Sequence, residues 1–102
     1  IILMASTIEM RDFIIDQIGL ETQLVSKPMM GEFLLYFEGV LFGGIYDDRF
    51  LVKIVPTNEH FSLPSALPYA EAKPMYWVQD LVDNSENLRE IVWDTCKGLK
   101  PS

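Results

Sequence analysis

Residues 28–48 read PMMGEFLLYFEGVLFGGIYDD, and this run predicts two consecutive β-hairpins. Glu38-Gly39 and Asp47-Asp48 are typical of two-residue turns, and the runs between them are rich in aromatic and aliphatic residues. The strands would be apolar on both faces of the sheet that they form. A chain of 102 residues has too few elements to cover both faces, so we expect one face to be reserved for another molecule.

The rest of the chain predicts an α+β domain around these hairpins. Ser6-Thr7-Ile8-Glu9 has the pattern of a capping box, and Gly19 can end the helix that follows. The expected helices are 7–18, a short one within 56–62 that Thr57 or Asn58 would cap, and a last one from Asp83 to Gly98. The expected strands are 23–26, 32–37, 40–46, 50–55 and 75–78, with a loop shaped by three prolines over 63–74. We therefore expect one domain over 1–102 with two layers, an antiparallel sheet with helices packed on one face, in the order α-β-β-β-β-α-β-α.

The two turns predict a register for the sheet. With two-residue turns, Phe37 faces Val40, Leu35 faces Phe42 and Tyr46 faces Arg49. One face then carries Leu34, Tyr36, Leu41, Ile45, Phe50, Val52 and Ile54. The other carries Phe33, Leu35, Phe37, Val40, Phe42, Tyr46 and Leu51, with Arg49 and Lys53 at its edge. We assign the first, more aliphatic face to the helices, although a slip of one residue in either turn would exchange the faces.

This assignment leaves an aromatic face for a partner. The candidate interaction surface consists of Phe33, Leu35, Phe37, Phe42, Tyr46 and Leu51. Such a patch seldom stays exposed on a soluble monomer, so it would dock a protein partner or close a symmetric homodimer. Gly43-Gly44 indicates either room for Phe33 or a β-bulge.

The charge balance argues against direct binding to nucleic acid. The net charge is −7, and the eight basic residues are dispersed among fifteen acidic ones. Phosphate backbones and anionic membranes both need clustered lysines and arginines. The longest uninterrupted apolar run, Phe33 to Phe37, is far too short to cross a bilayer. A single cysteine, Cys96, cannot form an internal disulfide, so we expect a cytoplasmic protein.

Residues that could carry catalysis are few. Cys96 falls on the apolar stripe of the last helix, where a buried thiol is more often inert than nucleophilic. His60 is either a surface residue or a general base. One cysteine and one histidine exclude zinc or copper sites built from those ligands. We therefore predict no enzymatic activity, no cofactor and no metal site.

Polar residues suggest a second kind of site. Glu32, Tyr69 and Lys73 form the candidate polar ligand site, with Tyr46 beside them, where the proline-rich loop would cross the sheet. Lys73 either pairs with an acid such as Glu32 or binds an anionic ligand or partner. Asp47 is either a turn residue or part of a hard-cation site, which Glu32 could approach across the hairpin.

Four separated motifs follow one another along the chain. They are Pro28-Met29-Met30-Gly31-Glu32, then Phe42 to Arg49 with Val52-Lys53, then Pro68-Tyr69, and then Ala72-Lys73-Pro74-Met75. In this order they resemble the N-terminal domain of the TfoX/Sxy family, over nearly the whole chain. The resemblance implies a two-layer α+β fold similar to secretion chaperones, a bacterial origin and a link to regulation of natural competence. In that family, two-domain members act with a cyclic-AMP-dependent transcription activator and carry a C-terminal domain that we do not expect here.

These observations favour a protein-interaction module over an enzyme. We expect it to be regulatory, related to competence and transcription regulators, and to act through protein partners or as a homodimer. The alternative is a small-molecule or anion-binding domain. Neither nucleic acid nor membrane is expected as a direct partner.

Overall fold

The alternating apolar runs of the sequence form a six-stranded antiparallel sheet in the computed structural model, which describes residues 6–20 and 22–99. Its strands are β1 (Leu24–Met29), β2 (Glu32–Phe37), β3 (Val40–Tyr46), β4 (Arg49–Val52), β5 (Ser65–Ala66) and β6 (Met75–Trp77). The helices are α1 (Ile8–Ile18), the 3-10 helix η1 (Pro56–Phe61) and α2 (Ser85–Lys97). The spatial order of the strands is β1-β2-β3-β4-β6-β5. The predicted α+β class and element order are confirmed, with the two-residue β5 as an addition.

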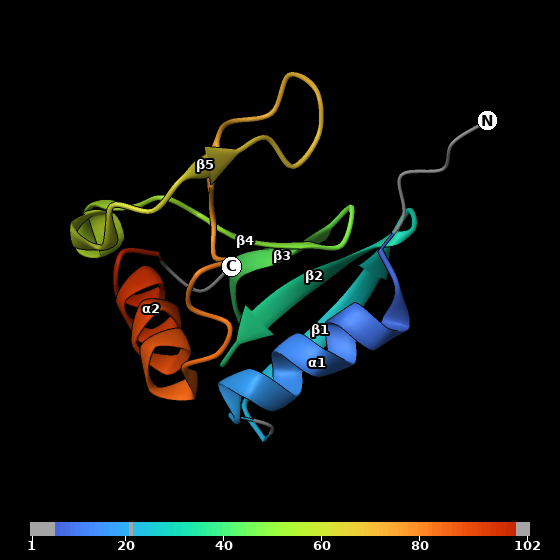
Figure 1. The fold of residues 1–102 in the computed structure, drawn as a ribbon, viewed down its shortest axis with the longest axis horizontal. Helices are drawn as coiled ribbons and strands as arrows, with labels where there is room; N and C mark the ends of the chain where they lie inside the picture. The colour runs from blue at the N-terminus through green and yellow to red at the C-terminus, as the bar shows by residue number, and fades with distance from the viewer. Residues whose placement is uncertain (1–5, 21, 100–102) are drawn as a thin grey trace.

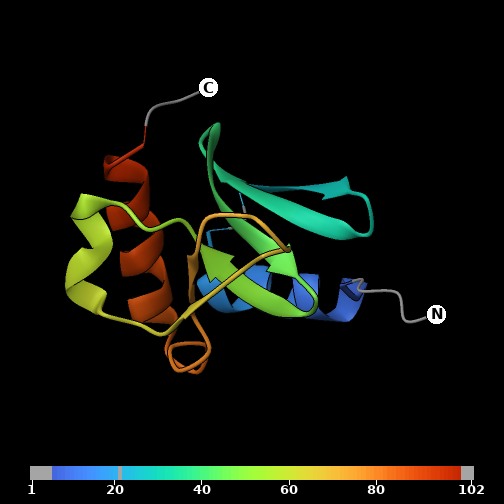
Figure 2. The ribbon, with the colours of Figure 1, turned by 90° about the horizontal axis from the view of Figure 1, so that it is seen from above.

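Both α-helices lie on one side of the sheet, and the chain between β5 and β6 lies on the other (Figure 1). In the described part of the chain, neither helix is long and apolar enough to cross a membrane. Figure 2 shows η1 beside α2 at one end of the sheet. The side-chain amide of Asn58 joins η1 to α2 by donating to Thr95 Oγ1 at 2.7 Å, and it also donates to the Lys53 carbonyl, just after β4, at 2.8 Å.

The helix ends differ slightly from the predicted ones. Thr7, rather than Ser6, caps α1, because Thr7 Oγ1 accepts the Met10 amide at 3.1 Å. The predicted capping box is therefore wrong, and Ser6 instead donates its hydroxyl to Glu32 at 2.8 Å. Gly19 ends α1 with φ near 75°, as its left-handed preference predicts.

A β-bulge divides the sheet into two halves with different registers. Phe37 pairs with Val40 as predicted, and beyond the second turn Tyr46 pairs with Arg49 as predicted. Between them the register shifts, so Leu35 pairs with Gly43 instead of Phe42. The shift depends on glycine at position 43, because a Cβ there would lie 2.9 Å from Val52 Cα and closer still to the Leu51 carbonyl.

The bulge also corrects the predicted assignment of faces. An extra residue in β3 reverses the alternation beyond it, so the halves before and after the bulge need opposite assignments. Beyond the bulge the assignment holds for Ile45, Phe50 and Val52, which pack in the cluster under the helices. It is wrong for Ile54, which lies outside that cluster and is 36% exposed. Before the bulge it is wrong: Phe33, Leu35, Phe37 and Phe42 are buried in that same cluster and are no interaction surface.

The remaining two residues of the predicted surface lie on the face away from the helices but are also buried. Tyr46 and Leu51 form a second, smaller cluster with Met75, against which Leu34, Ala66 and Trp77 pack. Tyr46 is 7% exposed and Leu51 is fully buried. The predicted aromatic docking surface is therefore divided between two packed clusters.

Candidate functional site

The face of the sheet away from the helices is only partly covered. Seen from above in Figure 2, the yellow and orange chain between β5 and β6 passes over the green strands β3 and β4. Segment 67–74 of this chain, which we call the covering loop, bounds two neighbouring hollows. The sequence predicts a shaped loop for this proline-rich segment, and the segment crosses the sheet where the polar residues were expected to meet.

The first hollow, which we call the Glu32 hollow, lies at the end of the sheet near the β1–β2 turn. It has a volume of about 690 Å³, and Met29, Met30, Glu32 and Arg49 line it together with residues 67–70. The second, the Lys73 hollow, has a volume of about 560 Å³. Its lining includes Leu34, Leu41, Lys53, Ile54 and Lys73.

The two hollows form one groove. Met29, Tyr46, Pro68 and Tyr69 line both of them. Each volume lies in the range of small-molecule pockets, roughly 300–1,000 Å³. The groove thus offers two adjacent subsites that share one wall.

Arg49 attaches the covering loop to the sheet. Its Nη2 donates to the Leu67 carbonyl at 2.9 Å, and its Nε donates to the Tyr46 carbonyl at 3.1 Å. Its guanidinium also lies over the Trp77 ring, 5.8 Å from the centroid. A planar guanidinium suits this combination of two hydrogen bonds and an aromatic face. The start of the covering loop is therefore fixed over β4.

Glu32 has a structural task at the end of the groove. Its Oε1 accepts the Ser6 hydroxyl at 2.8 Å, and its Oε2 accepts the Asp47 amide at 2.9 Å. Asp47 and Asp48 both have left-handed backbones, with φ near 53° and 56°, as expected for a primed hairpin turn. The Glu32 carboxylate is thus bound to the backbone of the Asp47-Asp48 turn, and both Glu32 and Asp47 line the Glu32 hollow.

The candidate polar site is brought together only in part. Glu32 and Tyr69 line the Glu32 hollow, and Tyr69 and Lys73 line the Lys73 hollow. Among the described residues, no ion pair joins Glu32 to Lys73. Tyr69 lines both hollows and so links the two subsites.

Tyr46 forms the floor between the subsites. Burial raises the pKa of its hydroxyl above the usual value near 10, and Tyr69 and the Glu32 carboxylate add to the increase. The phenol is therefore neutral at physiological pH and can donate a hydrogen bond.

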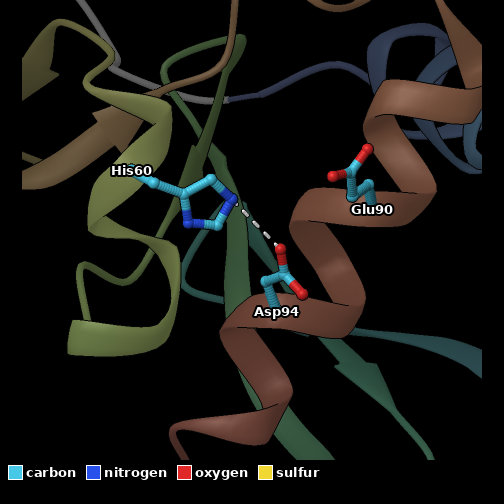
Figure 3. A group of neighbouring side chains, drawn as sticks. All are labelled: His60, Glu90 and Asp94. Carbon is cyan, nitrogen blue, oxygen red and sulfur yellow. Dashed lines mark ion pairs between the residues drawn. The ribbon is translucent and has the colours of Figure 1, made fainter.

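A separate group of side chains lies between η1 and α2. His60, Glu90 and Asp94 place one ligand atom each within 4.8 Å of one another (Figure 3). His60 Nε2 lies 3.3 Å from Asp94 Oδ2, and Lys97 Nζ lies 3.3 Å from Asp94 Oδ1. The ammonium of Lys97 competes with any cation for the Asp94 carboxylate. The arrangement therefore serves first as a polar contact, between His60 and Asp94, that joins η1 to α2.

The sequence alone does not reveal this group, because its members come from distant elements. Glu90 and Asp94 lie one helical turn apart, which is visible in the sequence. His60 reaches them only because η1 packs on α2. Cys96, on the same helix, has its pKa raised to about 11, chiefly by burial and also by Glu38, so its thiol is protonated at neutral pH.

Comparison with known proteins identifies a relative of unknown function. The chain is 32% identical over 101 residues to an "uncharacterized 12.7 kDa protein in trpE 5′ region" of Spirochaeta aurantia, covering 94% of this chain and 85% of that protein. No family model matches the chain, and no solved structure matches it. The identity and coverage show that this chain belongs to the family of the Spirochaeta aurantia 12.7 kDa protein.

Proposed function

We propose that this chain is a non-enzymatic protein-interaction module that holds a segment of a partner protein in the groove between its sheet and the covering loop. The observation that carries the proposal is the exposed apolar rim of the groove. Met29, Met30, Leu67 and Tyr69, all lining the Glu32 hollow, are 37%, 95%, 46% and 62% exposed. Exposed large apolar side chains concentrated at one site are typical of interaction surfaces.

The composition of the rim favours a macromolecular partner. Methionine adapts to irregular surfaces, and tyrosine supplies a large contact area with a polar end. Of the nine large hydrophobic residues exposed in the described chain, five line the groove when Ile54 is included. A small ligand inside either hollow would leave much of this rim in water, whereas a bound polypeptide would cover it.

The lining of the groove supports a binding role rather than catalysis. Within the described chain, the residues lining the two hollows include no serine, threonine, cysteine or histidine. The described lining therefore holds no pair of a hydroxyl or thiol nucleophile with a histidine base. The volumes of the hollows and the neutral Tyr46 phenol favour the second candidate, a small-molecule or anion receptor, at the same groove.

The place of such a module in the cell stays a prediction. The TfoX/Sxy resemblance would make it a regulator linked to competence and transcription, and the charge balance favours partners other than nucleic acid. A cytoplasmic location and a homodimer are likewise predictions.

The experiment that tests the proposed function compares matched surface variants in affinity capture. The groove variant carries Met30→Asp and Tyr69→Asp. Position 30 has φ near 52°, a left-handed backbone that aspartate tolerates better than methionine does. The control variant carries Trp93→Asp, which changes an exposed side chain on α2, 44% exposed and away from the groove.

Captured proteins are identified by mass spectrometry after nuclease treatment, and self-association is measured by analytical ultracentrifugation. We expect a stoichiometric partner that the wild type and the Trp93→Asp control retain and the groove variant loses. Self-association lost only in the groove variant would make the partner a second copy of this chain. Identical recovery with all three proteins would contradict the groove as the binding site.

A further inference from the structure

We propose that the partner segment is acidic as well as apolar, and that Lys53 and Lys73 bind its carboxylates in the Lys73 hollow. This inference rests on the proposed function, because it names the chemistry of the segment that the groove holds.

Charge is unevenly distributed between the helices and the face away from them. The chain has only eight basic residues against fifteen acidic ones. Four of the eight belong to the face away from the helices or to its covering loop: Lys27, Arg49, Lys53 and Lys73. The two α-helices carry six carboxylates against three basic residues, Arg11, Arg89 and Lys97. The same face and loop also carry three carboxylates, those of Glu32, Asp47 and Glu71. The groove side is therefore close to charge balance, whereas the two helices carry an excess of negative charge.

The lining of the Lys73 hollow combines two lysines with apolar residues. Lys53 and Lys73 are its two charged residues, and no carboxylate lines it within the described chain. The rest of the lining is apolar apart from the tyrosines, and includes Leu34, Leu41 and Met75. At an ammonium group beside an apolar surface, binding is most favourable for an anion that also carries an apolar group.

Neither lysine forms an ion pair in the described structure. The ion pairs there are Arg11–Asp12, His60–Asp94 and Lys97–Asp94, and none involves Lys53 or Lys73. Lys27, by contrast, lies over the Tyr36 ring at 5.0 Å, and Arg49 is bound to the covering loop. Lys53 and Lys73 are thus the cations on this face whose ammonium groups have no partner in residues 6–20 and 22–99.

The Glu32 hollow differs in charge from the Lys73 hollow, so a bound segment should lie along the groove in one orientation. Glu32, Asp47 and Arg49 line it; the Glu32 carboxylate already accepts two hydrogen bonds, and the Arg49 guanidinium donates to the Tyr46 and Leu67 carbonyls. A carboxylate from a partner would be repelled there and attracted at the Lys73 hollow. The apolar residues of the segment therefore contact Met29, Met30 and Tyr69, and its acidic residues lie toward Lys53 and Lys73.

Selection from a random peptide library tests this inference while the natural partner is unidentified. A phage-displayed library of 12-residue peptides is selected on the immobilised wild type and on Lys53→Gln/Lys73→Gln. The control is Lys27→Gln/Lys97→Gln, which removes the same number of charges from positions outside both hollows. We expect the wild type and the control to enrich apolar peptides that contain aspartate or glutamate.

The Lys53→Gln/Lys73→Gln variant should lose the preference for acidic residues while still enriching apolar peptides. A synthetic peptide chosen by the wild type should bind this variant about tenfold or more weakly in fluorescence polarisation, since charge-assisted hydrogen bonds are lost. Its affinity for the wild type should also fall as salt concentration rises. Lys53→Arg/Lys73→Arg should keep the acidic preference, and an unchanged thermal midpoint in each variant shows that the fold is retained.

The outcomes separate this inference from the proposed function. Enrichment of peptides without acidic residues, or equal selection by the Lys53→Gln/Lys73→Gln variant, would overturn the inference and leave the groove as a binding site. Failure of the wild type to enrich any peptide, or enrichment that Met30→Asp/Tyr69→Asp does not reduce, would overturn the proposed function itself.

Discussion

The two faces of the sheet are similarly apolar in sequence and differ in what covers them. Under the helices, Leu35, Phe42 and Ile45 are fully buried in a continuous core. On the other face, Leu51 packs in a smaller cluster with Tyr46 and Met75, the chain between β5 and β6 passes over β3 and β4 (Figure 2), and the groove stays open beside the cluster. Apolar residues on a strand therefore do not by themselves identify a docking face. The elements that pack over each face decide which side chains remain available.

The largest expected difference between the faces comes from two adjacent residues of β3. Phe42 is fully buried under the helices, whereas Leu41 is half-buried on the other face and lines the Lys73 hollow. Phe42→Ala should lower the free energy of unfolding by about 3–5 kcal/mol, because it leaves a cavity in the core. Leu41→Ala should cost about 1 kcal/mol. Urea denaturation measures both, and equal losses would contradict the assignment of the faces.

The bulge that separates the two registers gives the next largest effect. Gly43→Ala should lower the free energy of unfolding by about 2 kcal/mol or more, because the new Cβ would press on the backbone of β4. Gly39→Ala is the matched control: its φ near 82° is strained for alanine, but no atom lies within 4 Å of the added Cβ. It should cost only about 1 kcal/mol. Thermal unfolding ranks the two, and a greater loss at Gly39 would argue against the bulge.

A smaller effect is expected at alkaline pH from Cys96, which packs against the helix-covered core. Its pKa is raised from 9.0 to about 11 in the folded chain, so the folded state holds the proton more tightly than the unfolded state. The resulting stabilisation is fully present below pH 9 and is lost as the pH rises toward 11. The thermal midpoint should therefore fall over this range, and less steeply in Cys96→Ala. Equal slopes would show that the thiol is not shielded from solvent.

Local signals in the sequence predict most elements closely, although the strand predicted over 23–26 extends to Met29 and the one predicted over 50–55 ends at Val52. The strands 32–37 and 40–46 have the predicted bounds, and α1 begins one residue after the predicted start. The turns at Glu38-Gly39 and Asp47-Asp48 form as predicted, because their residues accept left-handed backbones. The final helix also ends at Gly98 as expected. Each of these features depends on a few neighbouring residues.

The faces and the groove could not be predicted in the same way. Gly43-Gly44 indicated a bulge or a close approach, and both occur: the register shifts beside Gly43, and a Cβ on Gly44 would lie 2.5 Å from the Phe33 carbonyl. The sequence does not say which residue is the extra one, and that choice reverses every later side chain. The candidate polar site was found in part, because Tyr69 meets Glu32 in one hollow and Lys73 in the other.

The amino-acid sequence by itself determines the α+β class, the two hairpins and the scarcity of catalytic groups, since these follow from spacing, turn chemistry and composition. Only the tertiary structure decides which face the helices cover, how the covering loop divides the open face, and which lysines line an apolar hollow. Those properties depend on contacts between residues far apart in the chain. A one-residue bulge can redirect such contacts without changing any local pattern.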